Sequence, residues 1–128
     1  MSRSGGRPVF DASAVLALLQ GEPGAEVLQK LQPDALVGAV NAAEVLAKLV
    51  SRGTPLQDAQ AAVDALHLET APFDASMAGV SARYVHKNVS LGDRCFLAAA
   101  EMYGTGWTSD HSLSALADRL PTLKFFRG

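Results

Sequence analysis

Short apolar runs of the kind that form buried strands alternate with longer segments of helical periodicity along nearly the whole chain. The strand-like runs cover residues 9–10, 35–40, 68–72, 106–108 and 122–126. The segments between them predict a helix from residue 13 to a stop at 21–23, and helices over 25–31, 41–52, 55–66, 74–86, 90–103 and 110–120. Strands joined through helices pair in parallel, which requires helices on both faces of the sheet. We therefore predict an α/β fold, a three-layer α/β/α sandwich with a mostly parallel sheet of about four to five strands.

The size and composition of the chain allow one folded domain. It has 128 residues, of which 48% are apolar, enough to build a hydrophobic core. We expect residues 1–7, which are polar and rich in glycine, to be a disordered lead-in to a single domain over residues 8–128. No apolar run approaches the roughly 18 residues that span a membrane. The lone cysteine, Cys95, permits no internal disulfide and fits a reducing cytoplasm.

Four acidic residues lie at the ends of these predicted elements. Asp11 directly follows the first strand, and Asp110 follows the strand that contains Trp107. Glu44 lies in the first turn of the helix after the second strand, and Asp93 lies in the first turn of a later helix. Since the carboxyl ends of parallel strands meet at one edge of a sheet, Asp11, Glu44 and Asp110 are predicted to lie near one another.

Helix capping is the alternative explanation for each acid taken alone. Asn41 and Glu44 have the spacing of a capping box, and Ser90 and Asp93 fit the same pattern with Asp in place of Glu. Simple N-caps would account for the other two acids. Neutral Ser, Thr or Asn side chains also supply a cap worth about 1 kcal/mol, so capping does not explain why four carboxylates gather.

A group of carboxylates at one edge is electrostatically unfavourable unless a cation neutralises it. Mg²⁺ and Mn²⁺ prefer oxygen ligands, and Mg²⁺ retains several waters. A water bound to such a metal is a nucleophile near neutral pH, and the metal also stabilises a phosphoryl oxyanion. We therefore interpret Asp11 as a metal ligand at the rim of the sheet, oriented in part by the neighbouring helix terminus.

Four stretches of the sequence resemble the motifs of the PIN domain family, and in particular the VapC-type toxins of bacterial toxin–antitoxin pairs. In chain order they are VFDASAVLALLQGEPGAE, VNAAEVLAKLVSRG, VSLGDRCF and GWTSD. Each motif is short, and their order within one small α/β domain makes the resemblance specific. The match runs from about Pro8 to Phe126, which is nearly the whole chain.

The resemblance implies a metal-dependent endoribonuclease, the toxin of a VapBC-type pair, in which water activated by Mg²⁺ or Mn²⁺ cleaves RNA phosphodiesters. Small hydroxyl positions that support the site by hydrogen bonding match Ser13 and Thr108. The resemblance further implies a cytoplasmic homodimer and a cognate antitoxin whose tail crosses the active-site groove. The family's catalytic acids, which bind the metal directly or through water, carry over to Asp11, Glu44, Asp93 and Asp110.

Three basic residues near Asp93 are candidates for contact with RNA phosphates, namely Arg83, Lys87 and Arg94. Arg83 and Lys87 have the i,i+4 spacing of one face of a predicted helix, and Arg94 neighbours Asp93. The alternatives are a solvated helix face whose cations suit the helix dipole and, for Arg94, an ion pair with a site carboxylate. The net charge of −2 gives no overall basic field, so only a local patch would bind RNA.

The sequence leaves two other functions open. A receiver-like, Mg²⁺-binding phosphoacceptor domain also gathers acids and a hydroxyl after its strands. It needs an acid pair near the start and a lysine after a late strand, whereas Asp11 stands alone and Lys124 lies within the last strand-like run. A non-catalytic module that binds RNA or an antitoxin is the second alternative, and the complete set of acids argues against it.

Overall fold

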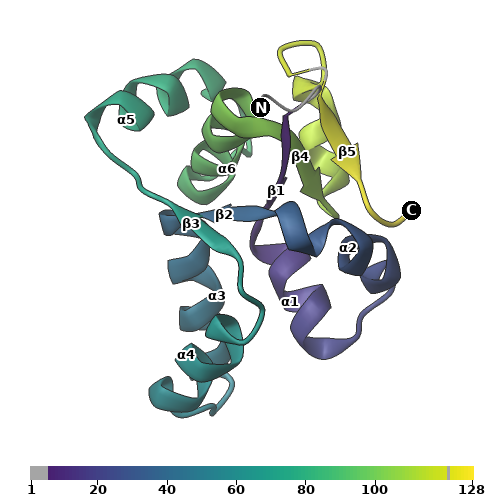
Figure 1. Ribbon diagram of the computed structural model, residues 1–128. Coiled ribbons are helices and arrows are strands. Elements are labelled where there is room, and N and C mark those ends of the chain that lie inside the picture. Colours follow the sequence, from purple (N-terminus) through teal and green to yellow (C-terminus); the bar gives the residue numbers. More distant parts are fainter. Residues whose placement is uncertain (1–5, 121) are drawn as a thin grey trace.

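The computed structural model describes residues 6–120 and 122–128 and places five strands in one fully parallel sheet (Figure 1). The strands lie side by side in the order β3-β2-β1-β4-β5. Their bounds are β1 Arg7–Phe10, β2 Leu36–Gly38, β3 Glu69–Ala71, β4 Gly104–Thr108 and β5 Leu123–Phe125. Parallel strands with helical crossovers confirm the predicted α/β fold class.

Helices connect each strand to the next. The α-helices among the described residues are α1 Ala12–Gln20, α2 Ala25–Leu31, α3 Ala39–Ser51, α4 Leu56–Asp64, α5 Ala75–Ser81 and α6 Leu91–Tyr103. Short 3₁₀ turns occur at η1 Gln32–Asp34, η2 Ala82–Tyr84 and η3 His111–Leu116. Because α1, α3 and η3 begin close behind β1, β2 and β4, the carboxyl edge of the sheet is where helical elements start.

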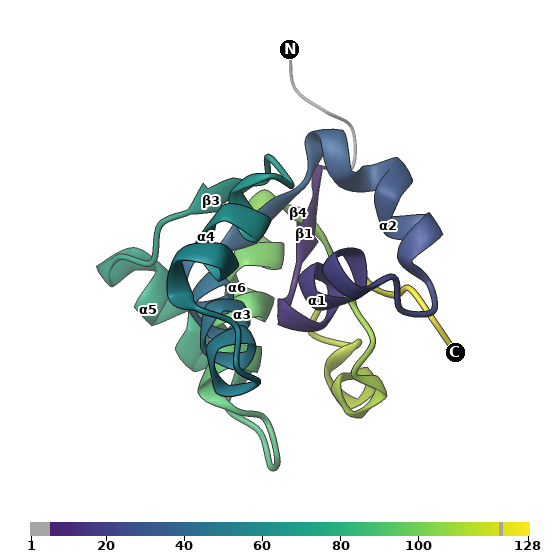
Figure 2. The same cartoon turned by 90° about the horizontal axis from the view of Figure 1, so that it is seen from below.

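Two apolar cores, one on each face of the sheet, give the domain its three layers. Val9 of β1 packs with side chains of α5, α6 and η3, whereas Phe10 packs with side chains of α1, α2, α3 and α4, as the alternation of a pleated strand requires. Figure 2 shows β1 between α6 on one side and α1 and α2 on the other. Gly106 of β4 lets α6 approach closely, because a Cβ there would lie 2.8 Å from Phe96 Cζ and 2.9 Å from Ala100 Cβ.

The second strand is shorter than its apolar sequence predicts, and this moves the start of α3. The run at 35–40 predicts a strand throughout, but β2 ends at Gly38, the last residue that pairs with β3. α3 therefore begins at Ala39, and Gly38 caps it without a side-chain hydrogen bond. The predicted capping role of Asn41 is wrong, because Asn41 lies inside the helix.

Two of the predicted helices are also shorter than expected. The helix predicted over 74–86 ends at Ser81 and gives way to η2. Tyr84 accounts for the change, because its buried side chain reaches α6 and its hydroxyl donates to Glu101 Oε1 at 2.7 Å. The segment predicted as a helix over 110–120 is the 3₁₀ turn η3, whose apolar side chains recur every three residues as this geometry favours.

The start of the sheet falls inside the segment predicted as a lead-in. Arg7 belongs to β1, while residues 1–5 of that segment lie outside the described residues. Arg7 Nη1 forms an ion pair with Glu69 Oε1 at 2.8 Å, and Arg7 Nε donates to the Asp34 carbonyl at 3.0 Å. No helix within residues 6–120 and 122–128 has both the length and the apolar character needed to cross a bilayer.

Candidate active site

The four acids singled out in the sequence line one cleft at the carboxyl edge of the sheet. Asp11 follows β1, and Asp110 follows β4, the strand that lies beside β1 in the sheet. Glu44 lies in α3, and Asp93 lies in the first turn of α6. The cleft has a volume of about 250 Å³. Its lining residues are Asp11, Ala12, Ser13, Asn41, Glu44, Lys48, Asp93 and Asp110.

Asp11 is the most enclosed of the four acids, with 7% of its surface exposed. It is the N-cap of α1, since its Oδ1 accepts hydrogen bonds from the Ala14 amide at 2.9 Å and the Ser13 hydroxyl at 2.6 Å. Its Oδ2 accepts a hydrogen bond from the Thr108 hydroxyl at the end of β4. A carboxylate offers about four lone-pair positions, so these bonds leave about one for a further ligand.

Backbone amides fix the direction in which the two hydroxyl groups donate. The Ser109 amide donates to Ser13 Oγ at 3.1 Å, and the Asp110 amide donates to Thr108 Oγ1 at 3.0 Å. Each hydroxyl oxygen already accepts a bond from an amide, so its hydrogen is available to Asp11. Two hydroxyl groups that donate to Asp11 stabilise the ionised form of its carboxylate. The supporting role of Ser13 and Thr108 in catalysis stays a prediction.

Burial opposes the charge that these donors favour. Loss of surrounding water raises the pKa of Asp11 from its ordinary value of 3.8 to about 6, and the charge of Asp93 acts in the same direction. The hydrogen bonds from Ser13, Thr108 and the Ala14 amide lower the pKa without cancelling the effect of burial. A cation held at the cleft would supply the stabilisation that the ionised form lacks.

Glu44 is held by side-chain contacts rather than by the backbone of its own helix. Asn41 Nδ2 donates to Glu44 Oε1 at 2.8 Å and to the Gly92 carbonyl of α6 at 3.1 Å. The capping box predicted for Asn41 and Glu44 is therefore absent, since the two side chains bond to each other and α3 starts two residues earlier. The Glu44 carboxylate therefore does not cap α3.

Asp93 and Asp110 cap helical turns, yet each does so with one oxygen. Asp93 Oδ2 accepts the Ser90 amide at 3.2 Å and Ser90 Oγ accepts the Asp93 amide at 3.1 Å, which confirms the predicted capping box. Asp110 Oδ1 accepts the amide and the hydroxyl of Ser112 at 3.0 Å and 2.6 Å. In the described part of the chain no hydrogen bond reaches Asp93 Oδ1 or Asp110 Oδ2. Capping and ligand binding are thus compatible in one carboxylate.

The donor set of the cleft suits a hard divalent cation held partly through water. Its acidic side chains offer oxygen atoms as donors, which Mg²⁺ and Mn²⁺ prefer as ligands. Among residues 6–120 and 122–128, no three Asp, Glu, His or Cys side chains lie close enough together to form a direct coordination shell as they stand. Mg²⁺ normally retains several waters, so a set of spaced carboxylates fits an ion that some of them reach through water.

Lys48 lines the same cleft and was missed by the sequence analysis. It lies one helical turn after Glu44 on α3, at the i,i+4 spacing that brings two side chains to one face. Among the described residues, no carboxylate lies within ion-pair distance of its ammonium group. A lysine on an exposed helix face ordinarily points into solvent. The i,i+4 spacing from Glu44 was the one feature of the sequence that could have assigned Lys48 to the site.

The three basic residues proposed from the sequence lie outside the lining of this cleft. Arg83 Nη1 pairs with Glu101 Oε2 at 2.7 Å, and Arg94 Nη1 donates to the Val89 carbonyl at 3.1 Å. The predicted i,i+4 pair of Arg83 and Lys87 is wrong because the helix ends at Ser81. Arg94 makes no ion pair with a site carboxylate among the described residues.

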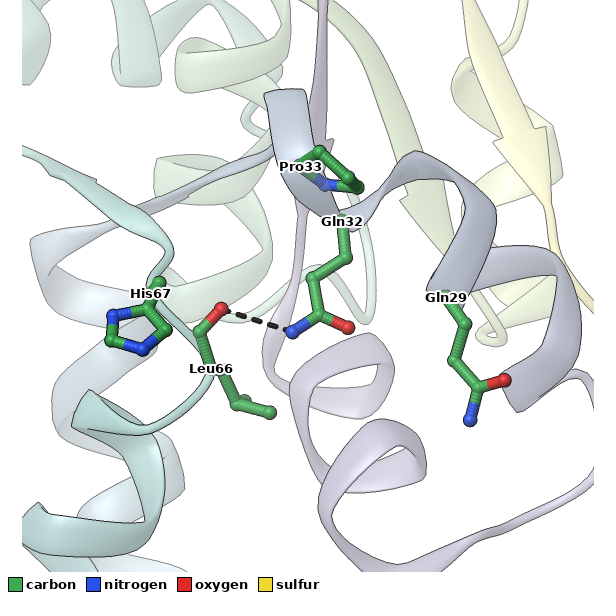
Figure 3. Close-up of a pocket in the computed structure, with 5 residues that line it drawn as sticks. All are labelled: Gln29, Gln32, Pro33, Leu66 and His67. Atoms are coloured by element: carbon green, nitrogen blue, oxygen red, sulfur yellow. Dashed lines mark hydrogen bonds between the residues drawn. The ribbon is translucent and has the colours of Figure 1, made fainter.

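A second cavity, of about 330 Å³, lies near the amino ends of β2 and β3 (Figure 3). Its lining residues are Gln29, Gln32, Pro33, Leu66 and His67. Gln32 Nε2 donates to the Leu66 carbonyl across the cavity at 2.9 Å. The described residues of this lining include no carboxylate, so this cavity, although larger than the acidic cleft, lacks the ligands that a hard cation needs.

Comparison with known proteins identifies the family to which this fold belongs. The PIN domain family model matches residues 9–118. The chain belongs to the PIN domain family. A search of the curated proteins found no match. Among solved structures, VapBC2 from Rickettsia felis bound to a promoter DNA fragment is similar, with 16% identity, a TM-score of 0.65, and 92% of this chain and 96% of that chain covered.

Two further solved structures share the fold. A toxin–antitoxin complex from Klebsiella pneumoniae has 18% identity and a TM-score of 0.72, over 91% of this PIN domain chain and 95% of that chain. A protein from Pyrobaculum aerophilum has 19% identity and a TM-score of 0.61, over 87% and 79% of the two chains. At these identities the likeness establishes the architecture of the PIN domain.

Proposed function

We propose that this PIN domain is a metal-dependent endoribonuclease and the toxin of a VapBC-type toxin–antitoxin pair. One observation carries the proposal. The side chains of Asp11, Glu44, Asp93 and Asp110, from four separate parts of the fold, line one cleft. Lys48 is the only basic residue among the described residues that line it. Membership of a family whose members are generally nucleases supports hydrolysis of a phosphodiester as the use of such a cleft.

The carboxylates are proposed to hold Mg²⁺ or Mn²⁺, with Asp11 as the central ligand. Ser13 donates to Asp11 Oδ1 and Thr108 donates to Asp11 Oδ2. Together these bonds fix the plane of the Asp11 carboxylate before an ion binds. Asp93 and Asp110 each keep one oxygen free of capping bonds for direct or water-mediated ligation. When bound, a divalent ion supplies an acidic water near neutral pH and stabilises a phosphoryl oxyanion.

The RNA substrate is proposed to meet the cleft through its phosphates. Lys48 is the basic group best placed to bind a phosphate beside the acids, because it lines the cleft and is unpaired within the described residues. Arg94 and Lys87 remain candidates for flanking phosphates. Arg83 is a weaker candidate, since Glu101 already neutralises it.

The proposed partner is an antitoxin protein. Two of the similar structures are described as a VapBC2 assembly and as a toxin–antitoxin complex, and both cover more than nine-tenths of this chain. A homodimer and a cytoplasmic setting belong to the same proposal and rest on the family resemblance. A receiver-like phosphoacceptor loses its support because the chain belongs to the PIN domain family. The non-catalytic binding module is the competing function.

The experiment is to purify the protein free of any bound antitoxin and incubate it with total RNA. One set of reactions contains Mg²⁺ or Mn²⁺ and the other contains a chelator, and the new 5′ ends are mapped. The proposal expects discrete cleavage sites that appear only with the metal. Stable RNA under every metal condition, from a folded protein that still binds RNA or an antitoxin, would support the binding module instead.

A further inference from the structure

The Glu44 carboxylate lies at the end of an exposed, flexible side chain, yet it has a defined position in the cleft. Asn41, one turn earlier on α3, donates a hydrogen bond to Glu44 Oε1 at 2.8 Å. Asn41 as a residue is 2% exposed, so the donor itself has little freedom to move. A buried amide therefore restrains a carboxylate that solvent would otherwise leave mobile.

The same amide group joins α3 to the start of α6. Asn41 Nδ2 also donates to the Gly92 carbonyl at 3.1 Å, so the two amide hydrogens are shared between Glu44 and α6. Asn41 Oδ1 is buried and has no hydrogen-bond partner among the described residues. Reversing the amide would point this oxygen at two acceptors, so the orientation that serves Glu44 is fixed.

Gly92 completes the arrangement because the Glu44 carboxyl group lies directly against it. A Cβ at position 92 would be 2.5 Å from Glu44 Cδ, 2.7 Å from Oε1 and closer still to Oε2. Gly92 lies in the first turn of α6 and its φ is not in the left-handed region, so the backbone does not require glycine. The requirement comes from the carboxylate.

We propose that Asn41 and Gly92 form a bracket that positions Glu44 for the site. Asn41 supplies the hydrogen bond, and Gly92 supplies the space beside Asp93 on a helix that packs against α3 (Figure 2). Both are positioning residues, since they act through Glu44. The inference rests on the proposed function for the use of Glu44 as a ligand, and it adds the residues that set its place.

A second glycine provides a matched control. Gly79 lies within α5, and a Cβ there would meet nothing within 4 Å. Alanine is the better helix former at both positions, so Gly79→Ala reports the gain from helix propensity alone. Gly92→Ala reports the same gain together with the displacement of Glu44.

The test measures melting of the metal-free protein with each glycine variant, alone and combined with Glu44→Ala. Gly79→Ala should raise the Tm by roughly 1–4 °C in both backgrounds. Gly92→Ala should lower the Tm, or raise it only slightly, when Glu44 is present, and should raise it more when Glu44 is removed. Equal effects of Gly92→Ala in the two backgrounds would overturn the bracket.

Two further readouts separate positioning from simple stability. In nuclear magnetic resonance spectra of the metal-free protein, the Asn41 side-chain amide should shift in Gly92→Ala as it does in Glu44→Ala, and stay in place in Gly79→Ala. Calorimetric titration should give about 10–100-fold weaker Mn²⁺ binding for Gly92→Ala and unchanged binding for Gly79→Ala. If the wild type binds no Mn²⁺, the proposed function fails, while the melting and spectroscopic results still decide the bracket.

Discussion

Charged side chains are paired at the amino edge of the sheet, whereas those that line the cleft at the carboxyl edge form no ion pairs among the described residues. At the amino edge, Arg7 pairs with Glu69 at 2.8 Å and donates to the Asp34 carbonyl at 3.0 Å, beside a cavity of about 330 Å³ lined by uncharged amides, a proline, a leucine and a histidine. At the carboxyl edge, four carboxylates and one lysine line a smaller cleft, and no ion pair joins any of them in the part of the chain that the structure describes.

The contrast teaches that unbalanced charge, rather than cavity size, marks the site. Charges at the amino edge are satisfied within the fold and contribute to stability. At the carboxyl edge the helix starts occupy one oxygen of Asp93 and one of Asp110, which leaves the other oxygens available. The fold therefore maintains a concentration of negative charge that it does not neutralise itself.

The largest expected effect comes from removing the charge at the centre of the acidic edge. Asp11→Asn keeps an oxygen that can cap α1 but loses the negative charge, so metal-dependent cleavage should fall by at least about 100-fold. The matched control is Glu69→Gln at the amino edge, which removes a paired carboxylate and should leave cleavage unchanged. Initial rates on a mapped RNA substrate check both. Loss of cleavage in Glu69→Gln would contradict the assignment of function to one edge.

The same substitution should stabilise the metal-free protein. The pKa of Asp11 is raised to about 6 in the folded state, so the folded protein binds more protons than the unfolded chain between pH 4 and 6. Stability from this residue is therefore greatest at low pH and is lost as the pH rises through 6. By pH 8 the penalty is about 3 kcal/mol.

Urea denaturation of wild type and Asp11→Asn in chelator measures this penalty. Asp11→Asn should be more stable by about 3 kcal/mol at pH 8, and the difference should close toward pH 4. A variant that is less stable at pH 8 would show that the fold itself neutralises Asp11. Adding Mn²⁺ should narrow the difference in stability, because the ion binds the wild type more tightly than the variant.

A smaller effect is expected from the lysine in the acidic cleft. If Lys48 binds a substrate phosphate, Lys48→Ala should raise KM several-fold, with little change in kcat, and reduce the dependence of binding on salt by about one phosphate contact. Lys30→Ala, on α2 and outside the cleft lining, is the control. An unchanged salt dependence would assign Lys48 to another purpose.

The smallest effect should come from the ion pair at the amino edge of the sheet. Glu69→Ala removes a partly exposed ion pair with Arg7 and leaves the Arg7 hydrogen bond to the Asp34 carbonyl in place; the Glu69 side chain is 61% exposed. Such pairs are worth about 0–1 kcal/mol, so the loss of stability should stay under about 1 kcal/mol and Mn²⁺ binding should not change. Thermal melting and metal titration of Glu69→Ala measure these quantities, and altered metal binding would mean that the two edges are coupled.

The sequence predicted the architecture because alternation of strands and helices is a repeated, local signal. It also placed Asp11, Glu44 and Asp110 near one another, since parallel strands end at one edge. The position of α3 could not be predicted, because β2 ends where its neighbour β3 ends and not where its apolar run ends. The misplaced helix start led to Asn41 being interpreted as a cap.

The contacts around Glu44 and the basic residues depend on how α3 and α6 pack, which no local pattern encodes. Nothing in the sequence distinguishes Gly92. The structure gives the reason for a glycine there, because the Glu44 carboxyl group lies against it. Arg83 was a candidate for contact with RNA from the sequence, which gave no sign of its ion pair with Glu101, eighteen residues later. Lys48 was overlooked although its spacing from Glu44 could have indicated it.

A calorimetric titration of Mn²⁺ into the antitoxin-free protein at neutral pH, repeated with Asp11→Asn and Glu69→Gln, tests the proposed metal site directly. We predict that wild type and Glu69→Gln bind the ion with equal affinity and that Asp11→Asn binds it at least about tenfold more weakly. Equal binding by all three proteins, or no binding by the wild type at millimolar Mn²⁺, would contradict the claim that the carboxyl edge is built to hold a divalent cation.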